Sequence, residues 1–200
     1  MKKIFLVVAI AFMAVATANA QDASFGLRGG VNIASLNGDD AGDLDSKIGF
    51  HVGGFAQFAL SDMVVLEPNV LFSLKGASAE TEIFGTTVEE SINLSYIDVP
   101  VLARIYVAEG FNVFVGPRLG LNLGGTYKAE ADGESEEEDI EDLRTLTLGL
   151  NAGLGYELPS GLNITAGYDL GLSSIFEDVE GETADIKNGV IQVSVGYKFN

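Results

Sequence analysis

The chain of 200 residues contains no cysteine, a single histidine and only four prolines. Without cysteine it can form no disulfide, and it cannot carry the cysteine of a lipoprotein signal. A lone histidine also excludes the histidine and cysteine clusters that bind most transition metals. Beyond the N-terminal segment, no apolar run reaches the roughly 18 residues that a membrane-spanning helix needs. Disulfide scaffolds and helical membrane proteins are therefore poor descriptions of this sequence.

The N-terminal segment has the features of a secretory signal peptide. Lys2 and Lys3 precede an apolar stretch over residues 4–15, and residues 18–20 (Ala-Asn-Ala) form a small-x-small cleavage site. We predict cleavage after Ala20, which gives a signal peptide over residues 1–20 and one domain over residues 21–200. An uncleaved membrane anchor is the alternative interpretation.

Positive charge is also scarce. Eleven lysines and arginines stand against 29 aspartates and glutamates, for a formal charge of −18, or −20 once Lys2 and Lys3 are removed. A chain this acidic repels nucleic acid, so no nucleic-acid partner is expected. Of the 29 acidic residues, 22 fall in four polar segments, at residues 37–46, 77–90, 129–142 and 177–188. We interpret these segments as long solvated loops.

What the sequence does contain is alternation with a period of two. Residues 144–158 read RTLTLGLNAGLGYEL, with five leucines, Ala152 and Tyr156 on one parity and mostly polar residues and glycine on the other. This period predicts a β-strand with two different faces. The segment is longer than the usual strand of about 5–6 residues, and it suits the roughly 9–11 residues that a tilted strand needs to cross a membrane.

Eight segments share this pattern, and the connections between them alternate between long and short. Three short turns at residues 61–62, 108–110 and 159–161 separate the four acidic segments. The fold class predicted is therefore all-β: an eight-stranded antiparallel up-and-down transmembrane β-barrel with four long outer loops and three short periplasmic turns. The predicted strands are residues 24–36, 47–60, 63–76, 91–107, 111–128, 144–158, 162–176 and 189–199.

Parity alone does not decide whether the apolar faces contact lipid or line a soluble calyx of the lipocalin kind. The glycine-rich polar faces suit the crowded interior of a narrow barrel, which favours contact with lipid and a location in the outer membrane. Aromatic residues of the apolar parity also gather at strand ends, as in the two girdles of membrane barrels. The predicted periplasmic girdle is Phe25, Phe58, Phe111, Tyr156 and Phe199, and the outer girdle is Phe50, Phe72, Tyr127 and Phe176.

Charged residues of the polar parity are predicted to form a network inside the barrel. Five cations and four anions nearly cancel, and in a narrow lumen they should pair, because an isolated buried charge is very costly. The predicted network closes the interior, and a narrow polar conduit is the alternative. Its members are Arg28, Glu67, Lys75, Asp98, Arg104, Arg118, Glu157, Asp169 and Lys198.

The most acidic segment offers candidate ligands for a divalent cation that could bridge to lipid head groups. Hard cations prefer several carboxylates, but no spacing here matches an EF-hand loop, and a solvated, repulsive rim is the plainer interpretation. The candidates are Glu134, Glu136, Glu137, Glu138 and Asp139.

Signals for catalysis are weak, so we expect neither an enzyme nor a cofactor. His51 shares the inward parity and is interpreted as a satisfied interior residue; a catalytic pair would need it near a rim and beside an acid. The sequence has no G-x-S-x-G motif and no cysteine nucleophile. Gly29-Gly30 and Gly124-Gly125 lie in strand patterns, unlike nucleotide-binding loops.

Several short motifs resemble the PorT-like outer-membrane β-barrel family common in Bacteroidetes, which shares the small barrel fold of OmpA and OmpX. The resemblance implies the fold and an outer-membrane location; most members have no assigned role, and one branch serves a protein-secretion system. It also implies recognition by the barrel-assembly machinery through the terminal aromatic, although Asn200 here follows Phe199. The motifs span the mature chain: residues 29–32 (GGVN), 66–68 (LEP), 75–76 (KG), 97–100 (IDVP), 115–117 (VGP), 169–173 (DLGLS) and 196–199 (GYKF).

Taken together, these patterns predict a monomeric outer-membrane barrel with a structural or interaction role. Its partners would be outer-membrane lipid and a protein that meets the acidic surface loops, while its polar interior is closed. The alternatives are a narrow porin-like channel and an accessory component of a protein-secretion system.

Overall fold

The computed structural model describes residues 23–42, 44–83, 86–131, 134–177 and 184–199. The predicted signal peptide, parts of all four acidic segments and Asn200 lie outside these described residues. Within them, no helix is long and apolar enough to cross a membrane.

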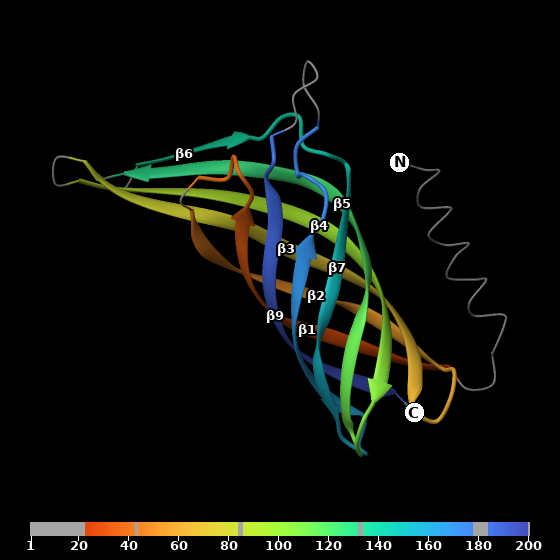
Figure 1. Ribbon diagram of the computed structural model, residues 1–200. Coiled ribbons are helices and arrows are strands. Elements are labelled where there is room, and N and C mark those ends of the chain that lie inside the picture. The colour runs from red at the N-terminus through yellow and green to blue at the C-terminus, as the bar shows by residue number, and fades with distance from the viewer. Residues whose placement is uncertain (1–22, 43, 84–85, 132–133, 178–183, 200) are drawn as a thin grey trace.

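The described residues form nine antiparallel strands, and eight of them close a ring (Figure 1). The ring runs β4-β3-β2-β1-β9-β8-β7-β5 and closes by pairing of β4 with β5, while β6 pairs only with β5 and lies outside it. This confirms the predicted all-β antiparallel barrel. The strands are β1 (Ala23–Asn37), β2 (Asp45–Ala59), β3 (Val64–Ile83), β4 (Thr86–Tyr106), β5 (Phe111–Ala131), β6 (Glu134–Asp139), β7 (Leu146–Glu157), β8 (Leu162–Gly171) and β9 (Lys187–Phe199).

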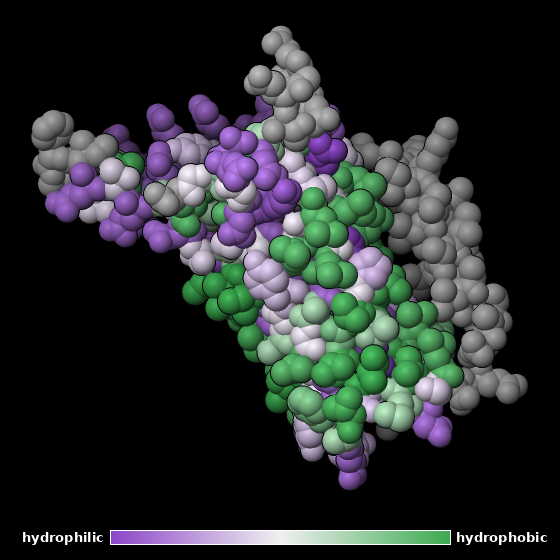
Figure 2. All heavy atoms as spheres, in the orientation of Figure 1, coloured by the Kyte–Doolittle hydropathy of each residue, from purple (hydrophilic) through white to green (hydrophobic). Residues whose placement is uncertain are grey.

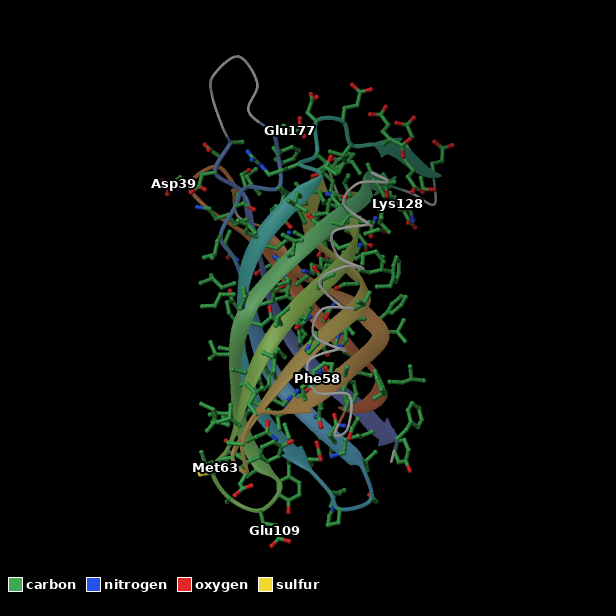
Figure 3. The ribbon with its side chains drawn as sticks, turned by 90° about the vertical axis from the view of Figure 1, so that its right-hand side faces the viewer. Asp39, Phe58, Met63, Glu109, Lys128 and Glu177 are labelled. Carbon is green, nitrogen blue, oxygen red and sulfur yellow. The ribbon has the colours of Figure 1, made fainter. Side chains whose placement is uncertain are left out.

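The three short turns lie together at one end of the barrel, as predicted. They connect β2 to β3, β4 to β5 and β7 to β8, and Figure 3 shows Met63 and Glu109 at this end. At this end the first residues of β1 pair with the last residues of β9, with Phe25 opposite Phe199. The first and last strands of the chain are therefore neighbours in the ring. We call the end with the three turns the short-turn end and the opposite end the long-loop end.

Two segments that the sequence analysis interpreted as loops are strands instead. β3 and β4 stay paired from Val64 opposite Ile105 to Ile83 opposite Thr86. β5 likewise continues to Ala131 and pairs with the additional strand β6. Acidic composition indicated loops, but backbone pairing needs no apolar side chain, and the acids stand on exposed faces. We call residues 78–83, 86–92, 126–131 and 134–139 the arm; it leaves the barrel sideways at the long-loop end and is largely hydrophilic (Figures 1 and 2).

The predicted strand over residues 162–176 is too long, because β8 ends at Gly171. The chain then folds over the long-loop end of the lumen, where Arg144 donates its backbone N–H to the carbonyl of Ile175 (2.7 Å). The result is an apolar cap. Its buried members are Leu36, Ala77, Leu94, Tyr96 and Ile175, against which Leu44, Ile92, Ile140, Leu143, Phe176 and Ile186 pack.

The outward faces of the strands are apolar and exposed, as contact with lipid requires (Figure 2). Near the long-loop end Phe50 and Phe72 lie with ring centroids 6.1 Å apart, and at the short-turn end Tyr197 packs edge-on against Phe199.

Two residues of the predicted girdles lie elsewhere. Phe176 belongs to the cap, because β8 ends before it. Tyr127 lies on the arm, where a bulge in β5 between Asn122 and Gly124 shifts the parity of the following residues. Phe58 keeps the outward parity near the short-turn end, opposite Leu66 on β3. The girdle prediction is therefore wrong for Phe176 and Tyr127.

Candidate functional site

The lumen near the short-turn end is filled by a carboxylate held between two guanidinium groups. Glu67 on β3 is fully buried, and it accepts hydrogen bonds from Nη1 of Arg28 on β1 (2.8 Å) and from Nε of Arg104 on β4 (2.6 Å). Nη2 of Arg104 also donates to Glu67 (2.9 Å), so this pair is bidentate. Gln57 donates a further bond to the same carboxylate (2.9 Å). We call Arg28, Glu67 and Arg104 the lower cluster.

A second cluster fills the lumen nearer the long-loop end. Nζ of Lys75 lies 2.8 Å from a carboxylate oxygen of Asp98 and 2.8 Å from one of Asp169. Arg118 reaches the other oxygens of the same two groups, at 3.0 Å and 2.8 Å. Two cations and two anions thus alternate around a closed ring, so the charges of the cluster balance. We call these four residues the upper cluster.

The last two members of the predicted network lie at the mouth of the short-turn end. Glu157 pairs with Lys198, and its carboxylate also accepts a hydrogen bond from the hydroxyl of Tyr106 (3.0 Å). This pair lines an open cavity of about 500 Å³ at that end. Of the nine predicted residues, the structure therefore brings seven together in two clusters and places two at the rim.

Aromatic residues inside the barrel support the cations, a feature that the sequence analysis missed. The guanidinium of Arg28 lies 4.7 Å from the ring centroid of Phe55, and that of Arg104 lies 4.9 Å from that of Phe114. Glycine makes room for these rings, because a Cβ on Gly26 would clash with the ring of Phe55. Phenylalanines of the inward parity among glycines of the same parity are the sequence feature that could have predicted these contacts.

Between the clusters lies a chain of polar side chains that includes the only histidine. Asn32 donates from Nδ2 to the backbone carbonyls of Leu74 (2.9 Å) and Phe50 (3.2 Å), which leaves its Oδ1 as an acceptor. His51 Nδ1 lies 2.8 Å from that oxygen, and His51 Nε2 lies 2.7 Å from the hydroxyl of Ser194. The bonds of Asn32 therefore assign the histidine proton to Nδ1.

This serine, histidine and asparagine have the hydrogen-bond order of a nucleophilic triad, but their surroundings do not suit one. His51 is 1% exposed, far from either rim, and its bonded partners are an amide and a hydroxyl rather than an acid. The adjoining cavity, which Arg28 also lines, measures only about 20 Å³. That volume suits about one water molecule.

The cap lies beyond the upper cluster at the long-loop end. Nζ of Lys75 in the upper cluster lies 5.1 Å from the ring centroid of Tyr96, whose hydroxyl accepts hydrogen bonds from Asn122 (3.3 Å) and Asn188 (3.2 Å). Beyond Tyr96 lie the apolar side chains of the cap. Going through the barrel, an ion would meet the lower cluster, the polar chain, the upper cluster and then the cap.

The five candidate cation ligands lie on β6, and every residue of this strand is exposed. Strand geometry divides them between two faces: Glu134, Glu136 and Glu138 alternate with Glu137 and Asp139. In the part of the chain that the structure describes, no three histidine, cysteine or acidic groups come close enough to hold a metal ion.

A polar lumen inside an apolar exterior is the arrangement of a small membrane barrel, and the comparisons with known proteins agree. A family model described as "outer membrane protein beta-barrel domain" matches residues 19–177. The chain belongs to this family. Its place is the outer membrane, with the short-turn end predicted to face the periplasm and the arm to face the outside.

Solved structures of outer-membrane barrels have the same fold. The attachment invasion locus protein Ail of Yersinia pestis superposes with a TM-score of 0.52 at 16% identity, covering 90% of this chain and 100% of Ail. Neisserial surface protein A gives 0.53 at 15% identity, with the same coverage. No curated protein matches the sequence.

Proposed function

We propose that this outer-membrane barrel is a closed scaffold that presents its acidic arm to a partner outside the cell. The observation that carries the proposal is the filled lumen, in which two charge clusters and an apolar cap lie in series and the cavity beside His51 measures about 20 Å³. Such a lumen holds a barrel rigid but has no passage for a solute. We propose no enzymatic role.

Conductance provides the first test. Reconstituted in planar lipid bilayers, the mature barrel is expected to give no conductance above background at 1 M salt, because an ion would have to displace paired charges in a low-dielectric interior. A conducting porin inserted in the same bilayer serves as the positive control for insertion and detection. Reproducible channel steps from the purified barrel would contradict the closed scaffold and favour the narrow channel.

The arm provides the second test. A photo-cross-linking residue at Glu137 on β6 is expected to give adducts with a partner on intact cells, since this strand is exposed and paired on one side only. The matched control carries the same residue at Asp62 in an exposed short turn and is expected to give no shared adduct. Equal yields of one adduct at both positions, or none at either, would contradict an arm partner.

The negative charge of the arm indicates which kind of partner surface it could bind. One structure of Ail contains the heparin analogue sucrose octasulfate, a polyanion. β6 of this chain instead carries five carboxylates in six residues, so a polyanion would be repelled and a basic protein surface attracted. We therefore propose a basic partner.

A narrower membership in the PorT-like family and an accessory role in protein secretion are a second proposal. The motifs that resemble that family support it, and the closed lumen limits the role to an accessory one because cargo could not pass. Deleting the gene in its source organism should then reduce the secreted proteins in the medium while the outer membrane stays intact; unchanged secretion would contradict the proposal.

A further inference from the structure

A cleft of about 580 Å³ opens where the arm leaves the barrel. Its lining comes from the start of β2 and from β3, β4 and β5, and Figure 3 shows Lys128 at this long-loop end. Both charge signs are present, since the lining includes Lys47, Glu80, Glu89, Lys128 and Glu130.

Strand register places this cleft on the lipid-facing side of the sheet. Glu89 on β4 lies opposite Glu80 on β3 and Glu130 on β5. Glu89 also has the parity of Ile97 further along β4, whose partners Phe72 and Leu121 are on the outward face. The cleft face is therefore the continuation of the lipid-contacting wall beyond the apolar band.

The rim of the cleft joins that apolar band directly. Ile48 lines the cleft and, at 76% exposed, is among the most exposed apolar residues of the barrel. It stands opposite Ile33, which has the outward parity, and Phe50 follows on the same face. A molecule in the cleft with a long apolar tail could therefore extend it along the barrel wall without crossing a polar surface.

The charges in the cleft are incompletely matched. Glu80, Glu89 and Glu130 form a row of like charges across three strands, an arrangement that is destabilising unless a cation lies near. Lys128 pairs with Glu130 at 2.8 Å. Lys47, in contrast, forms no ion pair with any described carboxylate. The cleft thus has an unpaired cation beside surplus carboxylates.

We propose that this cleft binds the headgroup of a membrane lipid that carries both a phosphate and a primary amine. The phosphate lies between Lys47 and Lys128, and the ammonium lies against Glu80 and Glu89. The acyl chains descend past Ile48. This site is separate from the closed lumen. It lies at the base of the arm and includes no residue of β6, the strand proposed to meet a protein partner.

Lipid retention tests the proposal. The barrel is reconstituted with equal amounts of phosphatidylethanolamine, phosphatidylglycerol and phosphatidylcholine, extracted in mild detergent, and its bound lipid is counted by native mass spectrometry. Phosphatidylethanolamine is expected to be retained about fivefold over each of the others, the ratio that one or two partly exposed ion pairs give. Equal retention of the three lipids overturns the proposal.

Two double variants test recognition of the phosphate and of the ammonium separately. K47Q/K128Q is expected to lower retention of all three phosphate-bearing lipids several-fold, whereas E80Q/E89Q is expected to remove only the preference for the primary amine. The control is K187Q, a lysine on β9 outside the cleft that pairs with Asp185. Heat-modifiable migration on gels shows that each variant is folded. A preference unchanged in both double variants, or lost equally in K187Q, overturns the proposal.

Discussion

Replacing Glu67 by glutamine is expected to lower the free energy of unfolding of the barrel by about 3–5 kcal/mol. The carboxylate accepts bonds from both Arg28 and Arg104, and all three side chains are buried. Glutamine keeps the shape but leaves two guanidinium groups without a counter-charge inside the barrel. Urea unfolding in lipid vesicles, followed by fluorescence or by the loss of heat-modifiable migration, gives the difference.

Two controls make this result specific to the buried charge. Glu109→Gln in an exposed short turn is expected to change stability by less than about 0.5 kcal/mol. A variant in which Arg28, Glu67 and Arg104 are all replaced by apolar residues of similar volume should recover much of the loss, because no unpaired charge remains. A loss below about 1 kcal/mol for Glu67→Gln would show that the lower cluster is solvated rather than sealed.

Replacing Val193 by arginine is expected to destabilise the barrel by about 2–4 kcal/mol, the cost of a cation on the lipid face near the middle of a membrane strand. Val193 lies mid-way along β9, between Val31 on β1 and Ala166 on β8, and is 48% exposed. In a water-soluble barrel the same exposed position would accept arginine with little effect. Unfolding in lipid vesicles measures the difference.

The matched control is Thr87→Arg on the exposed arm, which adds the same charge outside the lipid and should stay within about 0.5 kcal/mol of the parent. If Val193→Arg were as stable as Thr87→Arg, the outward wall would not be in contact with hydrocarbon.

Alternation in the sequence was sufficient to predict the ring, because each ring strand keeps one apolar face over the length that lipid covers. The same alternation placed nine charged residues inside. It did not predict which charged residues form ion pairs with one another. The ion pair between Lys75 on β3 and Asp169 on β8, for example, depends on barrel closure and strand register. Whether a pair closes the lumen is a property of the assembled ring rather than of any strand.

The errors have physical reasons of their own. Acidic composition suggested loops at residues 77–90 and 129–142, but an exposed hairpin can keep its backbone paired whatever side chains it carries. The cap was missed because Phe176 keeps the parity of the apolar face of β8, whereas Ile175 and Phe176 instead fold across the lumen. The bulge beside Gly124 leaves no sequence signal beyond glycine, yet it turns Tyr127 to the other face of the sheet.

The two charge clusters have a consequence for how the protein enters the membrane. Neither can be completed within one hairpin, since Arg28 on β1 must reach Glu67 on β3, and Lys75 on β3 must reach Asp169 on β8. The β3–β4 hairpin could pair Glu67 with Arg104 and Lys75 with Asp98 by itself. Arg28 on β1, Arg118 on β5 and Asp169 on β8 would still enter hydrocarbon without their partners if their strands inserted separately, which is prohibitively costly. Insertion should therefore follow the pairing of the last strands, so that the barrel enters the bilayer as a nearly complete cylinder. A chain truncated before β8 should remain at the membrane surface.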